Sequence, residues 1–197
     1  MRILLTALCW LLVSSAYAIG DGSEIQPADI FPRVKIETNM GNIVVELDRI
    51  KTPITTNNFL LYVTRGSYKG TIFHRVVKDF VVQGGGYDKD YNAKPTIRTI
   101  FNESGSGNKN EMYTIAMARE KDPHTANRQF YFNMNDNPSL DPGRKWGYAV
   151  FGRVVEGTEV LDKMADVETH TAPELGWTDV PKEPLVIEKA TLLPQQF

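Results

Sequence analysis

The chain has 197 residues and a formal net charge of −2, with 22 lysines and arginines against 24 aspartates and glutamates. This mildly acidic balance, without any block of basic residues, argues against nucleic acid as a partner. The one cysteine, Cys9, cannot form a disulfide within the chain, so the fold must rely on its hydrophobic core. The length suits a single domain.

The N-terminal segment has the pattern of a secretory signal peptide. One basic residue, Arg2, precedes an apolar run over residues 3–13, and small residues follow, ending in Ala16-Tyr17-Ala18. The run is too short for a comfortable membrane anchor, and the A-x-A pattern is typical of a cleavage site. We therefore predict a signal peptide over residues 1–18, cleaved after Ala18 together with Cys9.

Cleavage would leave a protein with no thiol and no membrane anchor. We expect it to be exported, to the periplasm if the host is a Gram-negative bacterium and otherwise as a secreted protein. Residues 19–31 are polar and contain Gly20, Gly22 and Pro27. This composition predicts a flexible leader ahead of the folded domain.

The first predicted elements are a β-hairpin and a helix. Apolar residues alternate with polar ones over residues 34–38 and again over 43–47, which indicates a hairpin with one buried face. Thr52-Pro53 is a typical helix start, with proline at the first helical position, and an apolar stripe follows until Gly66.

Two further strands are predicted within residues 73–83, where β-branched residues flank a Lys78-Asp79 turn. Three glycines follow at 84–86. A phosphate-binding loop would need a Lys-Ser or Lys-Thr and a helix after the glycines, and neither is present. We therefore predict a bulge or a tight turn there, and a loop over residues 87–109.

The second half of the chain continues the β pattern. Strands are predicted over residues 112–117, 129–134, 150–155 and 185–193, and a short helix is predicted through Val160, Leu161 and Met164. Many short strands with two modest helices, and no regular alternation of strand and helix, predict a mainly β fold. The expected architecture is a closed antiparallel barrel rather than an α/β sheet.

Familiar catalytic constellations are missing from the sequence. The histidines His74, His124 and His170 lack the spacing of metal ligands, and there is no Gly-x-Ser-x-Gly motif and no cysteine nucleophile in the cleaved chain. We therefore expect neither a metal nor another cofactor. His74 follows Phe73 on a predicted strand, and we interpret it as a satisfied core histidine rather than a catalytic base.

Arg75 lies in an apolar, β-branched segment together with Phe80 and Gln83. A guanidinium keeps its proton in proteins, so it offers a permanent fork of hydrogen-bond donors rather than a proton to exchange. The alternative is an ordinary solvent-exposed arginine on an edge strand. With Gln129 and Tyr131 at alternating positions of another strand, these residues suit a reaction that needs neither proton transfer nor a covalent intermediate.

Four ordered motifs carry a resemblance to one protein family. They are Phe-His-Arg-Val-Val-Lys-Asp-Phe-Val-Val-Gln-Gly-Gly-Gly at 73–86, Thr-Ile-Ala-Met-Ala-Arg at 114–119, Asn-Arg-Gln-Phe-Tyr-Phe at 127–132 and Tyr-Ala-Val-Phe-Gly-Arg-Val-Val-Glu-Gly at 148–157. With these motifs, residues 33–193 resemble the cyclophilin-type peptidyl-prolyl isomerases, most of all the exported, periplasmic branch of bacteria. The resemblance implies an eight-stranded antiparallel barrel capped by two α-helices, with a proline-binding groove, in a domain of residues 32–197.

The resemblance also implies roles for individual residues. Arg75 matches the catalytic arginine, and the amides of Gln83 and Gln129 match those that steady the arginine and the substrate backbone. The remaining matches are Phe80, Val81, Tyr131 and Leu140 for the walls of the proline pocket, Ala118 and Arg119 for the rim that takes the preceding residue, and Tyr148 for a position where many members have histidine.

The chain departs from the family pattern in and around the pocket. Val81 stands where methionine is common, and Tyr131 stands where phenylalanine is common, which affects the depth and polarity of the pocket. Ser139 stands where many eukaryotic members have tryptophan, so we expect cyclosporin to bind weakly. The loop Asp141–Gly147 is longer than usual, and its Trp146 either covers the groove or packs against the protein.

The implied function is peptidyl-prolyl cis-trans isomerisation, without a cofactor, in a monomer that helps exported proteins to fold. The expected partners are proline-containing polypeptides that are unfolded or partly folded. One alternative is a binding module or chaperone that uses the same groove with little turnover. Another is a barrel that carries a small ligand, but the groove motif gives no reason for an enclosed cavity.

Overall fold

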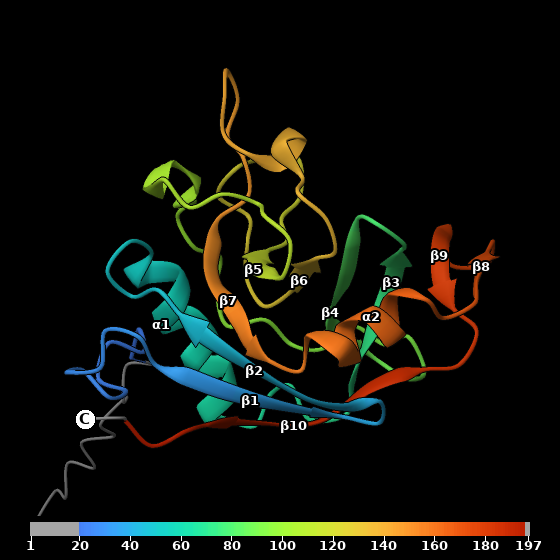
Figure 1. Cartoon of the computed structure of the whole chain (residues 1–197), viewed down its shortest axis with the longest axis horizontal. Helices are drawn as coiled ribbons and strands as arrows, with labels where there is room; N and C mark the ends of the chain where they lie inside the picture. The colour runs from blue at the N-terminus through green and yellow to red at the C-terminus, as the bar shows by residue number, and fades with distance from the viewer. Residues whose placement is uncertain (1–19, 196–197) are drawn as a thin grey trace, which may run out of the picture.

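The computed structural model describes residues 20–195. Eight strands form a closed barrel in the order β1-β10-β3-β4-β6-β5-β7-β2, and the neighbouring strands are antiparallel. The strands are β1 (Arg33–Thr38), β2 (Gly41–Leu47), β3 (Thr71–Val77), β4 (Val81–Asp88), β5 (Thr114–Met117), β6 (Phe130–Asn133), β7 (Val150–Glu156) and β10 (Leu185–Leu192). The mainly β barrel predicted from the sequence is therefore confirmed (Figure 1).

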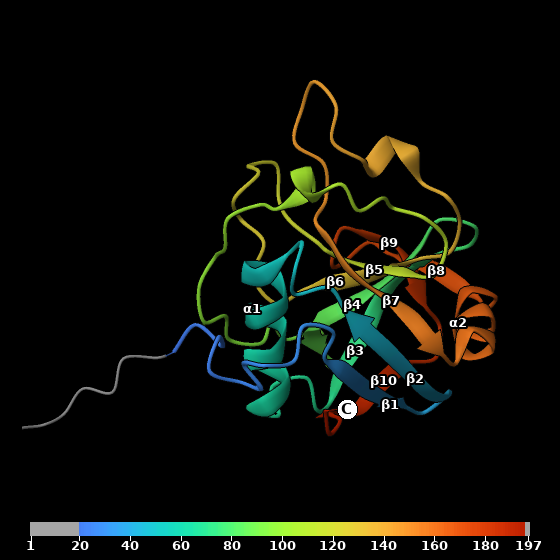
Figure 2. The same ribbon diagram turned by 60° about the vertical axis from the view of Figure 1, so that its left-hand side comes forward.

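Two helices cover opposite ends of the barrel, α1 (Pro53–Thr64) and α2 (Thr158–Ala165) (Figure 2). Pro53 occupies the first turn of α1, and Gly66, with a φ of 63°, follows its end, as the sequence predicts. The Phe59 ring of α1 packs edge-on against Phe130, with ring centroids 5.5 Å apart, inside the barrel. Among residues 20–195, no helix has the length and apolar character needed to cross a bilayer.

The predicted hairpin is formed by β1 and β2, in the register expected from the alternation of apolar residues. Val34 and Ile36 of β1 are buried and pair with Val45 and Ile43 of β2. The intervening side chains of β1 point outward, where Lys35 forms an ion pair with a neighbouring glutamate at 2.7 Å. The period-two pattern alone therefore places this hairpin in the barrel wall.

The glycine run forms a bulge inside one strand. Ile72 of β3 pairs with Tyr87, whereas the next residue, Phe73, pairs with Gly84, so Gly85 and Gly86 have no partners in the ladder. Gly85 has a φ of 84°, a conformation that other residues rarely adopt. The predicted bulge is confirmed, and β4 continues past it into the residues that we predicted as loop.

Other boundaries differ from the prediction by a few residues. Strand β5 begins at Thr114 rather than at Met112, because Tyr113 has a φ of 62° and interrupts the extended backbone. The sequence pattern missed a short hairpin, β8 (Thr169–Ala172) and β9 (Trp177–Pro181), which lies outside the barrel beside β3 (Figure 1). The side chains at positions 169–171 are exposed, so β8 shows no alternation of apolar and polar residues.

The segment predicted as a flexible leader is described from residue 20 onward and contacts the folded domain. Arg49 donates hydrogen bonds to the backbone oxygens of Ile25 at 2.7 Å and Asp29 at 2.8 Å. Gln26 donates its amide to the backbone oxygen of Leu193 at 2.9 Å. The predicted signal peptide, residues 1–18, lies outside the described residues.

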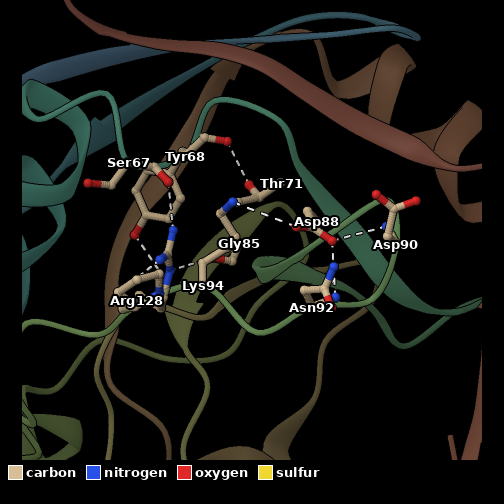
Figure 3. Close-up of polar contacts among 10 residues, drawn as sticks. Ser67, Tyr68, Thr71, Gly85, Asp88, Asp90, Asn92, Lys94 and Arg128 are labelled. Carbon is tan, nitrogen blue, oxygen red and sulfur yellow. Dashed lines mark hydrogen bonds and ion pairs between the residues drawn. The ribbon is translucent and has the colours of Figure 1, made fainter.

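A buried arginine joins three segments behind the bulge. The guanidinium of Arg128 donates to the backbone oxygens of Gly85 at 2.8 Å and Ser67 at 2.6 Å (Figure 3). It also donates to the backbone oxygen of Pro95 at 2.7 Å. Its side chain is therefore bonded to β4, to the long loop that follows β4, and to the turn after α1. Only 2% of Arg128 is exposed, and the structure gives it no carboxylate partner within residues 20–195.

Candidate active site

Four of the residues predicted for the site, namely Arg75, Val81, Gln83 and Tyr131, lie on strands β3, β4 and β6, and the other six lie in the turns, loops and short 3₁₀ helix between the strands. Arg75 of β3 is paired directly with Gln83 of β4, and Gln83 is paired with Tyr131 of β6. Three neighbouring strands therefore bring an arginine, an amide and an aromatic ring side by side. No group of three or more His, Cys, Asp or Glu side chains within residues 20–195 is arranged to hold a metal ion.

A second apolar cluster, separate from the barrel core, forms the pocket. Its buried members are Val81, Ala116, Tyr131 and Val150, and the half-buried side chains packed on them are Phe80, Ala118, Leu140 and Tyr148. All four residues predicted as pocket walls belong to this cluster. An apolar surface on the outside of a barrel, only partly covered by the chain itself, suits a small apolar ring such as that of proline.

The hydroxyl of Tyr131 is buried and has a hydrogen-bond partner outside the apolar cluster. It donates a hydrogen bond to the side-chain oxygen of Asn110 at 2.8 Å, and the residue is only 4% exposed. Burial raises the pKa of this phenol well above its ordinary value. Because the polar atom of Tyr131 already has a partner, its ring can face the pocket much as a phenylalanine would.

Arg75 keeps most of its hydrogen-bonding capacity free. Its Nε lies 3.8 Å from Oδ2 of Asp179 on the β8–β9 hairpin, and its Cζ lies 6.0 Å from the centre of the Phe80 ring. Among the described residues, Arg75 forms no other ion pair. Its side chain donates no hydrogen bond to any of them, and Gln83 bonds to Gln129 instead. The two Nη groups are therefore available to a ligand.

The two site glutamines bond to each other. The Nε2 of Gln83 donates to Oε1 of Gln129 at 3.1 Å. A Cβ atom at Gly86 would lie 2.6 Å from the Gln129 side chain, so the third glycine of the bulge leaves the space that Gln129 occupies. The steadying of Arg75 by Gln83 stays a prediction from the resemblance, because this structure shows a pair of glutamines instead.

Arg119, predicted at the rim, holds the long loop. It donates to the backbone oxygens of Trp146 at 2.7 Å and Gly147 at 3.1 Å, and its Cζ lies 4.4 Å from the centre of the Tyr148 ring. Tyr148 in turn packs against Tyr131, with ring centroids 5.9 Å apart. The rim and the pocket wall are therefore in direct contact.

A cavity of about 410 Å³ adjoins the pocket on the side of Arg75. It is lined by predicted site residues, namely Arg75, Gln83, Ala118, Arg119 and Gln129, and by Trp177 and Thr178 of the β8–β9 hairpin. Ala118 belongs to both the cavity lining and the apolar cluster, so all ten predicted site residues fall in two adjoining groups. The sequence pattern did not predict the β8–β9 hairpin, because its strands lack a regular alternation of apolar and polar residues. Its residues beside Arg75, including Asp179, were therefore missed as part of the site.

His74 is buried, but it is not a satisfied core residue. It is 7% exposed, and its ring packs against Tyr87 and Trp177 with centroids at 4.9 and 5.4 Å. Its buried Nδ1 has no hydrogen-bond partner in the described part of the chain, which corrects that part of the prediction. Burial, helped by the charge of Arg75, lowers the pKa of His74 to about 4.

We expect His74 to make the fold sensitive to acid. Because its pKa is about 4 in the folded state and near 6.5 when unfolded, its contribution to stability is present above pH 6.5 and is lost as the pH falls toward 4, by up to about 3 kcal/mol. His74→Phe keeps an aromatic ring and removes the titration. Urea unfolding at pH 7 and pH 4 should show a smaller loss for the variant than for the wild type. Equal losses would show that His74 is not buried as described.

Trp146 packs against other aromatic rings instead of covering the groove. Its ring lies 5.1 Å from that of His124 and 5.6 Å from that of Phe101, and 44% of the residue stays exposed. Ser139 is exposed in the short 3₁₀ helix η2 (Pro138–Leu140), next to the pocket residue Leu140.

Comparisons with known proteins identify the family. The family model "Cyclophilin type peptidyl-prolyl cis-trans isomerase/CLD" matches residues 33–192. The chain is 48% identical over 164 residues to peptidyl-prolyl cis-trans isomerase cyp18 of Streptomyces antibioticus, covering 81% of this chain and 98% of that protein. It is 42% identical over 163 residues to peptidyl-prolyl cis-trans isomerase B of Escherichia coli, covering 81% of this chain and 98% of that protein.

A solved structure has the same fold. The crystal structure of a cyclophilin type peptidyl-prolyl cis-trans isomerase of Cryptosporidium parvum matches with a TM-score of 0.70 and 25% identity, over 84% of this chain and 99% of that one. Another structure of that protein, determined in the presence of the dipeptide Ala-Pro, matches with a TM-score of 0.68. The chain belongs to the cyclophilin-type peptidyl-prolyl cis-trans isomerase family and is an enzyme of that class.

Proposed function

We propose that this isomerase acts on X-Pro bonds of exported proteins and thereby assists their folding, with Arg75 as the catalytic group. The observation that carries the assignment to Arg75 is its position: a guanidinium with free Nη groups stands beside a separate apolar pocket on the outside of the barrel. The clients are proline-containing polypeptides that are unfolded or partly folded, and the enzyme acts as a monomer.

The chemistry follows from the electronic structure of the amide bond. Rotation about an X-Pro bond crosses a barrier of about 18–20 kcal/mol, because the nitrogen shares its lone pair with the carbonyl group. When the bond twists, the nitrogen regains its lone pair and becomes a better hydrogen-bond acceptor. A guanidinium fixed nearby binds this twisted form more strongly than either planar form, which lowers the barrier.

Each part of the site has a role in this scheme. The pocket formed by Phe80, Val81, Tyr131 and Leu140 holds the proline ring while the acyl side turns. The amides of Gln83 and Gln129 offer hydrogen bonds to the substrate backbone, and Ala118, Arg119 and Tyr148 bound the groove beside it. No group has to gain or lose a proton. His74 is neutral at pH 7, since burial holds its pKa at about 4.

Export is the second part of the proposal, and its support is the N-terminal pattern of Arg2, an apolar run and Ala16-Tyr17-Ala18. The intact mass of the protein recovered from the periplasm or the medium should correspond to a chain that begins at Ile19. A recovered chain that still contains Cys9 would contradict cleavage after Ala18.

Assistance of folding can be tested with a protein whose refolding is limited by a slow X-Pro isomerisation. The wild-type enzyme, in amounts well below stoichiometric, should speed the slow phase, and Arg75→Ala should do so far less. A chaperone or binding module would change the yield of folded protein without changing the rate of that phase, and this outcome would overturn the proposal.

We expect cyclosporin to inhibit this enzyme weakly, because Ser139 offers neither a flat apolar surface nor an indole donor beside Leu140. Ser139→Trp should tighten inhibition by about tenfold or more, which corresponds to about 1.4 kcal/mol. Ser139→Ala is the matched control and should change little. Unchanged inhibition in Ser139→Trp would show that position 139 does not face the inhibitor.

A further inference from the structure

We propose that a surface patch next to the proline pocket binds acidic stretches of client polypeptides, and that it gives this isomerase a preference for X-Pro bonds with acidic residues nearby. The patch consists of the rings of Phe101, His124 and Trp146 and the basic side chains of Lys121, Arg144 and Lys145. This inference rests on the proposed isomerase function and specifies its substrates.

The aromatic part of the patch is exposed. Phe101 is 54% exposed and Trp146 is 44% exposed. The rings of Phe101 and His124 are stacked, with centroids 4.4 Å apart and an angle of 15° between their planes, and Trp146 meets both of them edge-on. Exposed aromatic rings that support one another offer contact area to a bound chain at a low cost in side-chain entropy.

The charges of the patch indicate which polypeptides it would bind. A hollow of about 680 Å³ beside Trp146 is lined by four basic residues, Arg119, Lys121, Arg144 and Lys145, and by a single acidic one, Glu120. The whole chain, in contrast, has a net charge of −2. Lys121, Arg144 and Lys145 form no ion pair in the described part of the chain, so these cations can bind carboxylates of a polypeptide.

The part of the patch formed by Arg144, Lys145 and Trp146 is held in place, although it lies on a loop that projects from the barrel between η2 and β7 (Figure 1). Arg119 donates to the backbone oxygens of Trp146 and Gly147, and the side-chain amide of Asn102 donates to that of Gly147 at 3.0 Å. A Cβ atom at position 147 would overlap the backbone of residues 140–142, so Gly147 allows the loop to close on itself. A binding surface with a fixed backbone loses less entropy when a ligand binds.

The patch is continuous with the proline pocket. Tyr148 packs against the pocket residue Tyr131 on one side and beneath Arg119 on the other, and Arg119 and Tyr148 both line the hollow. An extended polypeptide advances by roughly 3.3 Å per residue, so a chain with its proline in the pocket reaches the patch within a few residues. Acidic residues at that separation can contact the patch during catalysis.

The test uses three peptides with the same central X-Pro bond and with glutamates, glutamines or lysines in the flanking positions. At low salt, kcat/KM should be about five- to tenfold higher for the glutamate peptide than for the lysine peptide, mainly because KM is lower. High salt should reduce this ratio.

The double variant Arg144→Glu/Lys145→Glu should invert the order of the three peptides. The matched control is Lys69→Glu/Lys163→Glu, which changes the same number of charges on the turn after α1 and on α2 and should leave the order unchanged.

The dissociation constants of the same peptides, measured by titration, should follow the same order. Equal kcat/KM and equal affinity for all three peptides would contradict the proposal that the patch binds acidic stretches, and would leave the isomerase function intact. Affinity ordered by charge without any turnover would support the patch and contradict the proposed function. An order that persists in Arg144→Glu/Lys145→Glu would show that other charges select the peptide.

Discussion

Arg128→Met should lower the free energy of unfolding by about 3–5 kcal/mol. The side chain is 2% exposed and donates to three backbone oxygens in different segments. Methionine fills much of the same volume but removes the donor from all three oxygens, of which the one on Gly85 is buried and those on Pro95 and Ser67 are partly buried. Leaving a buried oxygen without a donor costs about 1–3 kcal/mol before the structure relaxes. Urea unfolding of the two proteins measures the difference.

Arg128→Lys should be nearly as destabilising, because one ammonium group cannot replace a planar fork whose nitrogens point at three separate carbonyls. The cation also packs on two tyrosine rings, 5.3 Å from the centre of Tyr62 and 5.8 Å from that of Tyr68. Arg65→Met, at the exposed end of α1, is the control and should cost little. A loss below about 1 kcal/mol for both Arg128 variants would show that solvent reaches these carbonyls.

Arg75→Ala and Arg75→Lys should each lower kcat/KM for a proline peptide by roughly 30- to 1000-fold, equivalent to about 2–4 kcal/mol of transition-state stabilisation. Lysine preserves the charge and can still pair with Asp179, but it replaces two free Nη groups with a single flexible ammonium. Peptide affinity and the melting temperature should change little, because the apolar cluster that holds the ring is intact. Near-normal turnover in the lysine variant would show that charge alone is sufficient.

Much of the barrel could be predicted from the sequence, and so could the site residues that lie within one short segment of the chain. The β1–β2 hairpin followed from period-two alternation, and α1 followed from Thr52-Pro53 and Gly66, because these signals are local. Arg75, Phe80 and Gln83 lie within one short segment, so a single motif was enough to place them. The bulge could be predicted because a run of glycines has few other uses in a strand.

The features that were missed depend on contacts between distant segments. Asp179 reaches Arg75 only because the β8–β9 hairpin packs beside β3. The first three residues of β8 are all exposed, so its sequence shows no alternation of apolar and polar residues. The carboxylate of Glu103 accepts hydrogen bonds from the backbone of Thr55 at 2.7 Å and Ile54 at 3.2 Å, and it thereby caps the start of α1 from the distant loop between β4 and β5. The pairing of Gln83 with Gln129 likewise requires two strands in register.

The measurement that tests the assignment most directly is the exchange rate between the cis and trans forms of a proline peptide. It should be followed by NMR with a small amount of wild-type enzyme and, separately, of Arg75→Ala. The uncatalysed exchange takes tens to hundreds of seconds. We expect the wild type to accelerate it strongly and the variant to do so far less, while both bind the peptide with similar affinity. Binding without acceleration by the wild type, or equal acceleration by the two proteins, would contradict a catalytic Arg75 beside an apolar proline pocket.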